Sequence, residues 1–375
     1  MKTQSPVISV GLCALALWAG AATGVAADQV VDIVMVPRLT IAGTLGATDQ
    51  IQYCTNLSQP HWVVLTNMVV AQTNYSFVDA DAPPAPRRFY RVVVSSPEGM
   101  ALIPAGSFTM GDSLDGDENS IPRHSVNVSA FFMDKYLVTK SLWDTVKAWN
   151  GGNGYGYDNA GSGKAPTHPV QTVNWYDVVK WCNARAEMEG LQPCYYADTN
   201  LAAVYKSGQV TNPWVKWSAS GYRLPTEAEW EKAAWGGASG HRFPWSDADS
   251  ITQSRANYFS STAYAFDVST TRGYHPTFND GVNPYTSPVG YFGANGYGLY
   301  DMAGNVWEWC WDWYGWYSSD SQTDPRGPAS GWWRVVRGGS WSNDAMRCRS
   351  ANRYSPNPTY SDNEFGFRCV RVPSP

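Results

Sequence analysis

The sequence predicts an α+β protein with little regular structure, preceded by a small all-β domain. After an apolar leader, short runs rich in Val, Ile and Tyr alternate with turn-forming residues up to about residue 96. Beyond that point, short helical patterns are separated by long aromatic stretches. The 34 glycines and 24 prolines supply frequent turns, and an aromatic content of 14% supplies material for a core.

Composition limits the classes of function. The chain has 375 residues, 43% of them hydrophobic, which excludes a disordered polypeptide. Its formal net charge of −5 excludes a generic basic surface for nucleic acid, so no nucleic-acid partner is expected.

Residues 1–27 have the layout of a secretory signal peptide. Lys2 supplies the positive start, residues 7–22 are almost wholly apolar, and small residues at 25–27 offer a cleavage site. The apolar run is shorter than a comfortable membrane span, and no later stretch reaches 18 apolar residues. We therefore expect an exported protein, secreted or periplasmic, without a membrane span.

Residues 28–96 are predicted to form a small β-sandwich accessory domain. Six strand-like runs in so short a segment favour an antiparallel sandwich. No side-chain pattern in it points to site chemistry, so docking or spacing is the expected role. The predicted strands cover residues 30–36, 38–44, 50–57, 62–70, 75–80 and 88–95.

Residues 97–375 form the second predicted domain, with three short helices. Each begins at a residue whose side chain can accept a hydrogen bond from the first helical turn. The first is expected to bury Leu142, Val146 and Trp149, which share a helical face. The caps are Thr139, Asn174 and Thr226, and the helices are expected to end near residues 150, 190 and 234.

Two further segments carry a local pattern. Residues 307–314 alternate between Trp or Tyr and other residues, which predicts one strand with two different faces. Residues 115–119 resemble the start of an EF-hand loop, but Ser120 and Val126 stand where its glycine and glutamate belong. A solvated acidic loop is expected instead.

Landmarks in register over residues 98–375 resemble the formylglycine-generating enzyme, or sulfatase-modifying factor, family. The resemblance implies a loop-rich, C-type-lectin-like fold and a copper- and O2-dependent oxidation of a sulfatase cysteine to formylglycine. The landmarks include GMALIPAGSFTMG at 99–111, HPVQTVNW at 168–175, RLPTEAEWE at 223–231, NGYGLYDM at 295–302, GNVWEW at 304–309, RGGSW at 337–341 and GFRC at 366–369.

The family's paired copper-binding cysteines are incomplete in this chain. Soft copper(I) is bound by thiolates, and the family places two of them after a Gly-Gly-Ser turn. Counting forward from Ser340 puts Asn343 at the first position and Cys348 at the second; counting back from Cys369 moves Cys348 off the second position as well. Copper is therefore expected only if Cys310 and Cys348 are free thiols that substitute for the pair. The resemblance makes Cys348, Ser340 and Cys310 the candidate catalytic residues, with Trp307 and Trp341 lining a pocket.

Six cysteines remain after the predicted cleavage, and by themselves they allow fifteen full pairings. The resemblance implies a Cys182–Cys369 disulfide, because the family pairs the equivalent positions. In an oxidising compartment a Cys310–Cys348 bridge is expected in preference to a metal site. Cys54 and Cys194 are left unassigned.

The resemblance also implies two structural calcium sites. Hard Ca²⁺ prefers carboxylate, amide and carbonyl oxygens, which both sets of residues supply. The first set is Asp301, Gly304, Val306 and Glu308, and the second is Asn257, Tyr258, Asp280 and Val282.

Three hypotheses for function follow. The first is an exported oxidoreductase of the formylglycine-generating type, acting on a protein or peptide substrate such as a sulfatase. The second is a non-catalytic, calcium-stabilised module that binds a peptide or a glycan. The third, a nonheme-iron sulfoxide synthase relative, would need a helical domain with an iron-binding histidine motif, which this chain lacks.

Overall fold

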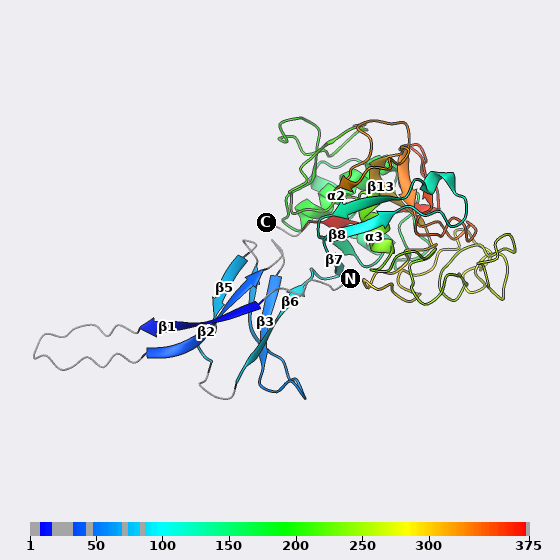
Figure 1. The fold of residues 1–375 in the computed structure, drawn as a ribbon. Coiled ribbons are helices and arrows are strands. Elements are labelled where there is room, and N and C mark those ends of the chain that lie inside the picture. Colours follow the sequence, from blue (N-terminus) through cyan, green and yellow to red (C-terminus); the bar gives the residue numbers. More distant parts are fainter. Residues whose placement is uncertain (1–7, 17–32, 43–47, 70–73, 83–86, 373–375) are drawn as a thin grey trace, which may run out of the picture. The chain divides into compact units, whose positions relative to one another are not determined.

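The computed structural model describes residues 8–16, 33–42, 48–69, 74–82 and 87–372 (Figure 1). The chain divides into two compact units. Unit 1 comprises residues 1–96 with 373–375, and unit 2 comprises residues 97–372. In the described part of the chain, no helix is long and apolar enough to cross a membrane.

Unit 1 contains two three-stranded antiparallel sheets, ordered β1-β2-β5 and β4-β3-β6. Buried Leu39, Ile41 and Ile51 come from both sheets and form one apolar cluster, which Phe77 and Tyr90 extend. The sandwich arrangement itself stays a prediction. The strands are β1 (Ile8–Ala16), β2 (Ile33–Ala42), β3 (Thr48–Cys54), β4 (Val63–Val69), β5 (Asn74–Val78) and β6 (Phe89–Ser95).

Two predictions for this unit need comment. The runs at 30–36 and 38–44 were expected as separate strands, but their described parts form the single strand β2, which continues through Pro37. Of the predicted signal segment, only residues 8–16 are described, and they pair with β2 as strand β1. Cleavage of this segment stays a prediction.

Unit 2 contains short strands, three α-helices and long loops. Figure 1 shows the stretch between α3 and β13 as loops without a helix. The strands are β7 (Met100–Ile103), β8 (Gly106–Met110), β9 (His124–Val128), β10 (Phe131–Asp134), β11 (Tyr195–Tyr196), β12 (Trp214–Val215), β13 (Trp307–Trp313), β14 (Gln322–Thr323), β15 (Arg334–Arg337), β16 (Arg353–Tyr354), β17 (Phe365–Gly366) and β18 (Val370–Arg371). The helices are α1 (Lys140–Trp149), α2 (Trp175–Met188) and α3 (Glu227–Ala234), with 3-10 turns η1 (Glu118–Ser120) and η2 (Asn150–Gly152).

The three helices begin where the sequence predicts. The Thr139 hydroxyl accepts from the backbone N–H of Leu142, while Asn174 and Thr226 form capping boxes at the starts of α2 and α3. These caps satisfy N–H groups that would otherwise have no partner within the helix.

The expected buried face of α1 is wrong in detail. Its buried residues are Trp143 and Val146, whereas Leu142 and Trp149 are only partly buried. Trp143 determines this face because its indole stacks on Trp181 of α2, with centroids 5.8 Å apart and planes at 4°. Phe367 packs edge-on against both rings.

Four sheets organise unit 2, and the largest has the order β16-β15-β13-β17. Strand β13 confirms the strand predicted at 307–314 and is buried on both faces. Its Glu308 pairs with Arg337 of β15 and Gly366 of β17. This sheet carries three of the predicted site residues, Trp307, Glu308 and Cys310, all on β13.

Candidate functional site

Cys310 and Cys348 are both buried free thiols, in different parts of the core. Cys310 belongs to a cluster with Trp230, Met302 and Val335, whereas Cys348 packs with Tyr258 and neighbouring residues in a second cluster. Among the described residues, no sulfur contact joins them, so the structure does not bring this predicted pair together.

Burial raises the pKa of both thiols above the ordinary range, because a thiolate would lose its hydration there. Copper(I) requires thiolates close to one another. Within the described part of the chain, no three His, Cys, Asp or Glu side chains are grouped so that they could hold a metal ion. The residues at these positions therefore do not fit the family's copper centre.

Ser340 is fully buried beside a carboxylate. Its hydroxyl donates to Oε2 of Glu364 at 2.6 Å. The Ser340 hydroxyl oxygen also lies 2.9 Å from Oδ1 of Asn343. Asn343, the residue at the first copper position in the forward count, is therefore a hydrogen-bond partner of Ser340. The turn follows Gly339, where an added side chain would meet the Arg347 carbonyl oxygen and the Cys348 sulfur.

Cys182 and Cys369 are brought together. Their sulfurs lie 3.7 Å apart as free thiols, so α2 and the chain next to β18 meet at the predicted position. The bond itself stays a prediction. Cys194 is buried nearby, and burial raises the pKa of its thiol to about 12.

Trp307 and Trp341 are buried, at 3% and 4% exposed. Trp307 packs on Tyr354, and Trp341 packs on Tyr274 and Tyr285. Neither indole lines the cavity described next.

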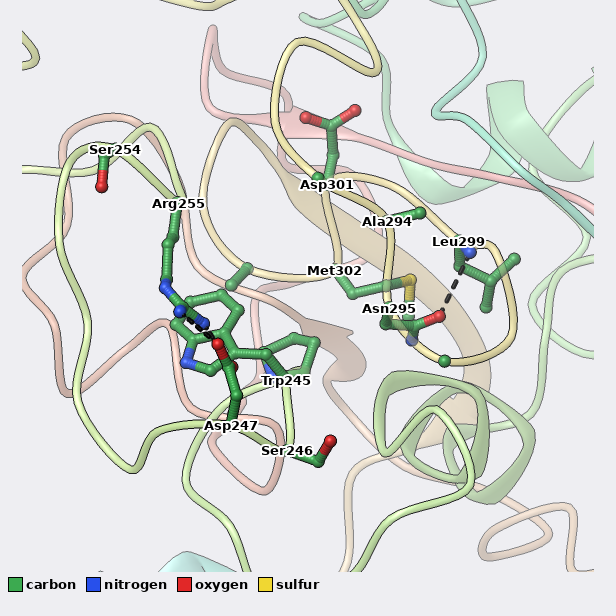
Figure 2. A pocket seen from close by; sticks show the side chains of 14 residues that line it. Trp245, Ser246, Asp247, Ser254, Arg255, Ala294, Asn295, Leu299, Asp301 and Met302 are labelled. Atoms are coloured by element: carbon green, nitrogen blue, oxygen red, sulfur yellow. Dashed lines mark hydrogen bonds and ion pairs between the residues drawn. The ribbon is translucent and has the colours of Figure 1, made fainter.

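A cavity of about 490 Å³ opens between the loops at 244–255 and 293–303 (Figure 2). Arg255 and Asp247 form a two-bond ion pair on one side, with both distances 2.6 Å, and Arg255 lies over the Trp245 ring at 5.2 Å. Leu299 and Met302 supply an apolar wall opposite. The volume is in the range of small-ligand sites. Part of the cavity lining, including Asn295, Asp301 and Met302, belongs to the landmark at 295–302, whereas no motif marked residues 244–255.

The first calcium set contains a buried oxygen without a partner. Oδ1 of Asp301 has no hydrogen bond, although Oδ2 accepts from the Gly290 N–H at 2.7 Å. Burial raises the pKa of Asp301 to about 6, and the hydrogen bond from Gly290 only partly offsets it. The charge of Arg368 also lowers this pKa without restoring its ordinary value, so a cation at Oδ1 would compensate the carboxylate further; calcium at this position stays a prediction. The Glu308 carboxylate already pairs with Arg368 at 2.7 Å.

The expected solvated acidic loop is only partly correct: Gly116 and Glu118 are exposed, but the aspartates bind arginines. Asp112, Asp115 and Asp117 surround the fully buried guanidinium of Arg349, with contacts of 2.9, 3.2 and 2.9 Å. Arg242 also binds Asp115, at 2.9 Å. An internal cation thus occupies the position that a metal takes in an EF-hand.

A second buried charge network lies under α3. Glu227 contacts Arg337 at 3.1 Å and Arg353 at 2.5 Å, and Glu231 binds Arg337 at 2.5 Å. In the sequence, the only indication of this network was the row of glutamates at 227, 229 and 231. The local pattern explains these residues as the start of a helix. The arginine partners lie more than a hundred positions away.

Asp312 lies beside this network and gives a pH-dependent prediction. Its Oδ2 accepts from the Glu227 N–H at 2.8 Å, and burial, with the negative charge of Glu227, raises the pKa of Asp312 to about 8. The folded state therefore binds this proton more tightly than the unfolded state. Stability contributed by the protonated form is lost as pH rises from about 4 to 8.

Replacing Asp312 by Asn keeps an oxygen acceptor and removes this titration. We expect Asp312→Asn to gain stability relative to the unmodified chain as pH increases from 5 to 8, measured by urea unfolding. The exposed control Asp320→Asn should show no such trend. A pH-independent difference for Asp312→Asn would contradict the prediction.

Comparison with known proteins agrees with these landmarks. Residues 87–373 match the model of the sulfatase-modifying factor enzyme 1-like domain. The chain belongs to the sulfatase-modifying factor family. The formylglycine-generating enzyme of Thermomonospora curvata is 35% identical over 303 residues, covering 74% of this chain and 94% of that protein.

Family members carry different names. Chaperone protein LppX of Paenibacillus barcinonensis is 33% identical over 251 residues, covering 65% of this chain and 79% of that protein. Serine/threonine-protein kinase pkn1 of Chlamydia pneumoniae is 32% identical over 282 residues, or 72% of this chain, but the match spans only 38% of the kinase. Among solved structures, Treponema denticola variable protein 1 matches with a TM-score of 0.57 and 28% identity, covering 78% of this chain and 98% of that one.

Proposed function

We propose that this family member binds a polypeptide and does not oxidise cysteine. The observation that carries the proposal is the separation of Cys310 and Cys348 into two core clusters, each thiol fully buried. Oxidation of a sulfatase cysteine through copper(I) needs a thiolate pair that the substrate can reach. The chain retains the family's fold but does not have this arrangement.

A polypeptide ligand is supported by two considerations. A relative covered over most of its length is named as a chaperone protein, and another is named as a formylglycine-generating enzyme, whose family is expected from the resemblance to act on a sulfatase cysteine. The cavity in Figure 2 offers an apolar wall next to a partly exposed ion pair, whose charges can be exchanged for those of a peptide. The predicted signal segment supports an exported site of action.

The oxidase alternative is tested with copper(I), O2, a reductant and a peptide that carries the sulfatase motif Cys-x-Pro-x-Arg (CxPxR), whose cysteine the family is expected to oxidise. We expect no peptide aldehyde by mass spectrometry and no tight copper(I) binding in competition with a chelator. Aldehyde formation that disappears in Cys348→Ser would overturn the proposal. The N-terminal sequence of protein recovered from the periplasm or medium, expected to begin near residue 28, checks export.

The binding role is tested on a random-sequence peptide array. We expect retained peptides, and at least a tenfold weaker affinity in Ala294→Trp, which places an indole at an exposed cavity-lining position. Ala329→Trp, at an exposed alanine outside the cavity, is the matched control. Retention of no peptide, or equal loss in both variants, would contradict a peptide site in the cavity; glycan-array binding instead would favour the glycan alternative.

A further inference from the structure

In the second predicted calcium set, a lysine of the chain lies on two ligand oxygens at once, whereas in the first set Arg368 pairs with Glu308 and Oδ1 of Asp301 has no hydrogen bond. The Lys164 ammonium donates to Oδ1 of Asp280 at 2.6 Å and to the backbone oxygen of Val282 at 3.0 Å. These are two of the four oxygen donors that the resemblance assigns to calcium.

A third oxygen of this calcium set already accepts a hydrogen bond. The backbone oxygen of Tyr258 accepts from Nε2 of Gln253 at 3.1 Å. Only Oδ1 of Asn257 is buried without a partner, while its Nδ2 donates to the Tyr285 oxygen at 2.8 Å. The second set therefore does not fit calcium as the chain stands.

The surroundings of Lys164 favour a persistent contact. Its side chain is only 18% exposed, and its ammonium lies 5.5 Å from the centre of the Tyr285 ring, within cation–π range. Asp280 also accepts from the Val282 N–H at 3.1 Å, which holds the two acceptors on one side of the loop.

We propose that the Lys164 ammonium takes the place of the second calcium ion and keeps Ca²⁺ out of this loop. One positive charge with directional N–H donors replaces a divalent ion whose ligands would be the same carboxylate and carbonyl oxygens. The conformation of residues 280–282 is then independent of the calcium concentration.

The test is the number of Ca²⁺ ions bound by the chelator-treated chain, measured by calorimetry. Lys164→Met removes the ammonium and keeps an unbranched side chain. We expect this variant to bind one more Ca²⁺ than the unmodified chain, and the extra ion to disappear in Lys164→Met with Asp280→Asn. Lys147→Met is the matched control, because Lys147 binds a backbone oxygen and lies over a tyrosine ring without a carboxylate partner.

Terbium gives a second measurement at the same position. Tyr285 lies close enough to sensitise Tb³⁺ bound there, so Lys164→Met is expected to gain tyrosine-sensitised emission, and Lys147→Met is not. Equal Ca²⁺ stoichiometry in the unmodified chain and Lys164→Met would overturn the proposal. So would loss of a Ca²⁺ ion from the unmodified chain on Asp280→Asn, because it would show that calcium displaces the lysine.

Discussion

Replacing Arg349 by alanine is expected to destabilise unit 2 by about 3–5 kcal/mol, the cost of removing one partner from a buried ion pair. The guanidinium is fully buried and contacts carboxylates of Asp112, Asp115 and Asp117. Without it, these acids keep their negative charges in a site from which water is excluded. Urea unfolding followed by tryptophan fluorescence measures the loss, because all tryptophans except Trp18 and Trp62 lie in unit 2.

Arg347 provides the control for Arg349. It is two residues away and exposed, so Arg347→Ala should change the free energy of unfolding by less than about 0.5 kcal/mol.

The pH dependence of the stability lost in Arg349→Ala separates the effect of charge from that of packing. Burial raises the pKa of Asp117, but hydrogen bonds from Ser120 and Asn119 and the charge of Arg349 together lower it.

The stability that Asp117 contributes is therefore present above its unfolded pKa near 4 and is lost as pH falls further. In Arg349→Ala the Asp117 carboxylate loses the charge that lowers its pKa, so the difference between the two chains should shrink toward pH 4. An equal difference at pH 4 and pH 7 would show that Arg349 acts through packing alone.

Replacing Glu227 by alanine is expected to cost a similar amount, about 3–5 kcal/mol, because two buried guanidiniums lose their shared carboxylate. Burial alone would raise the pKa of Glu227, but Arg353 and Arg337 lower it, so it is charged in the folded protein. Urea unfolding at pH 7 is the measurement, and exposed Glu98→Ala is the control.

A double-mutant cycle makes the Glu227 prediction specific. Arg353→Met removes one of the two cations, so Glu227→Ala with Arg353→Met should lose less than the sum of the single losses. Additive losses would mean that Glu227 stabilises α3 by its helix position and not by the ion pairs at 2.5 and 3.1 Å.

Local signals in the sequence located the helices and the central strand well. Thr139, Asn174 and Thr226 cap helices within a few residues of themselves, so a short window contains the necessary information. The alternation at 307–313 likewise predicts β13. The buried face of α1 was missed because Trp181, which stacks on Trp143, comes from another helix.

The site was less predictable because its decisive contacts join distant residues. The local sequence at 115–119 predicts a solvated loop, and only the distant residues Arg242 and Arg349 show that its aspartates are paired. Lys164 carries no motif, yet its ammonium lies on two oxygens of the second calcium set. The resemblance named these oxygens as ligands, but the contact of Lys164 with them depends on the fold.

The ion pairs of Arg349 also bear on how the chain folds. Arg349 and Asp112 are 237 positions apart, and the Cys369 N–H donates to Asp134 across 235 positions. Such contacts give a high contact order, which slows folding. Unit 2 cannot complete its charged interior until nearly all of its residues have been synthesised. Until then, the aspartates of the acidic loop remain in water. Partly folded chains expose apolar surface, the kind of surface that chaperones bind.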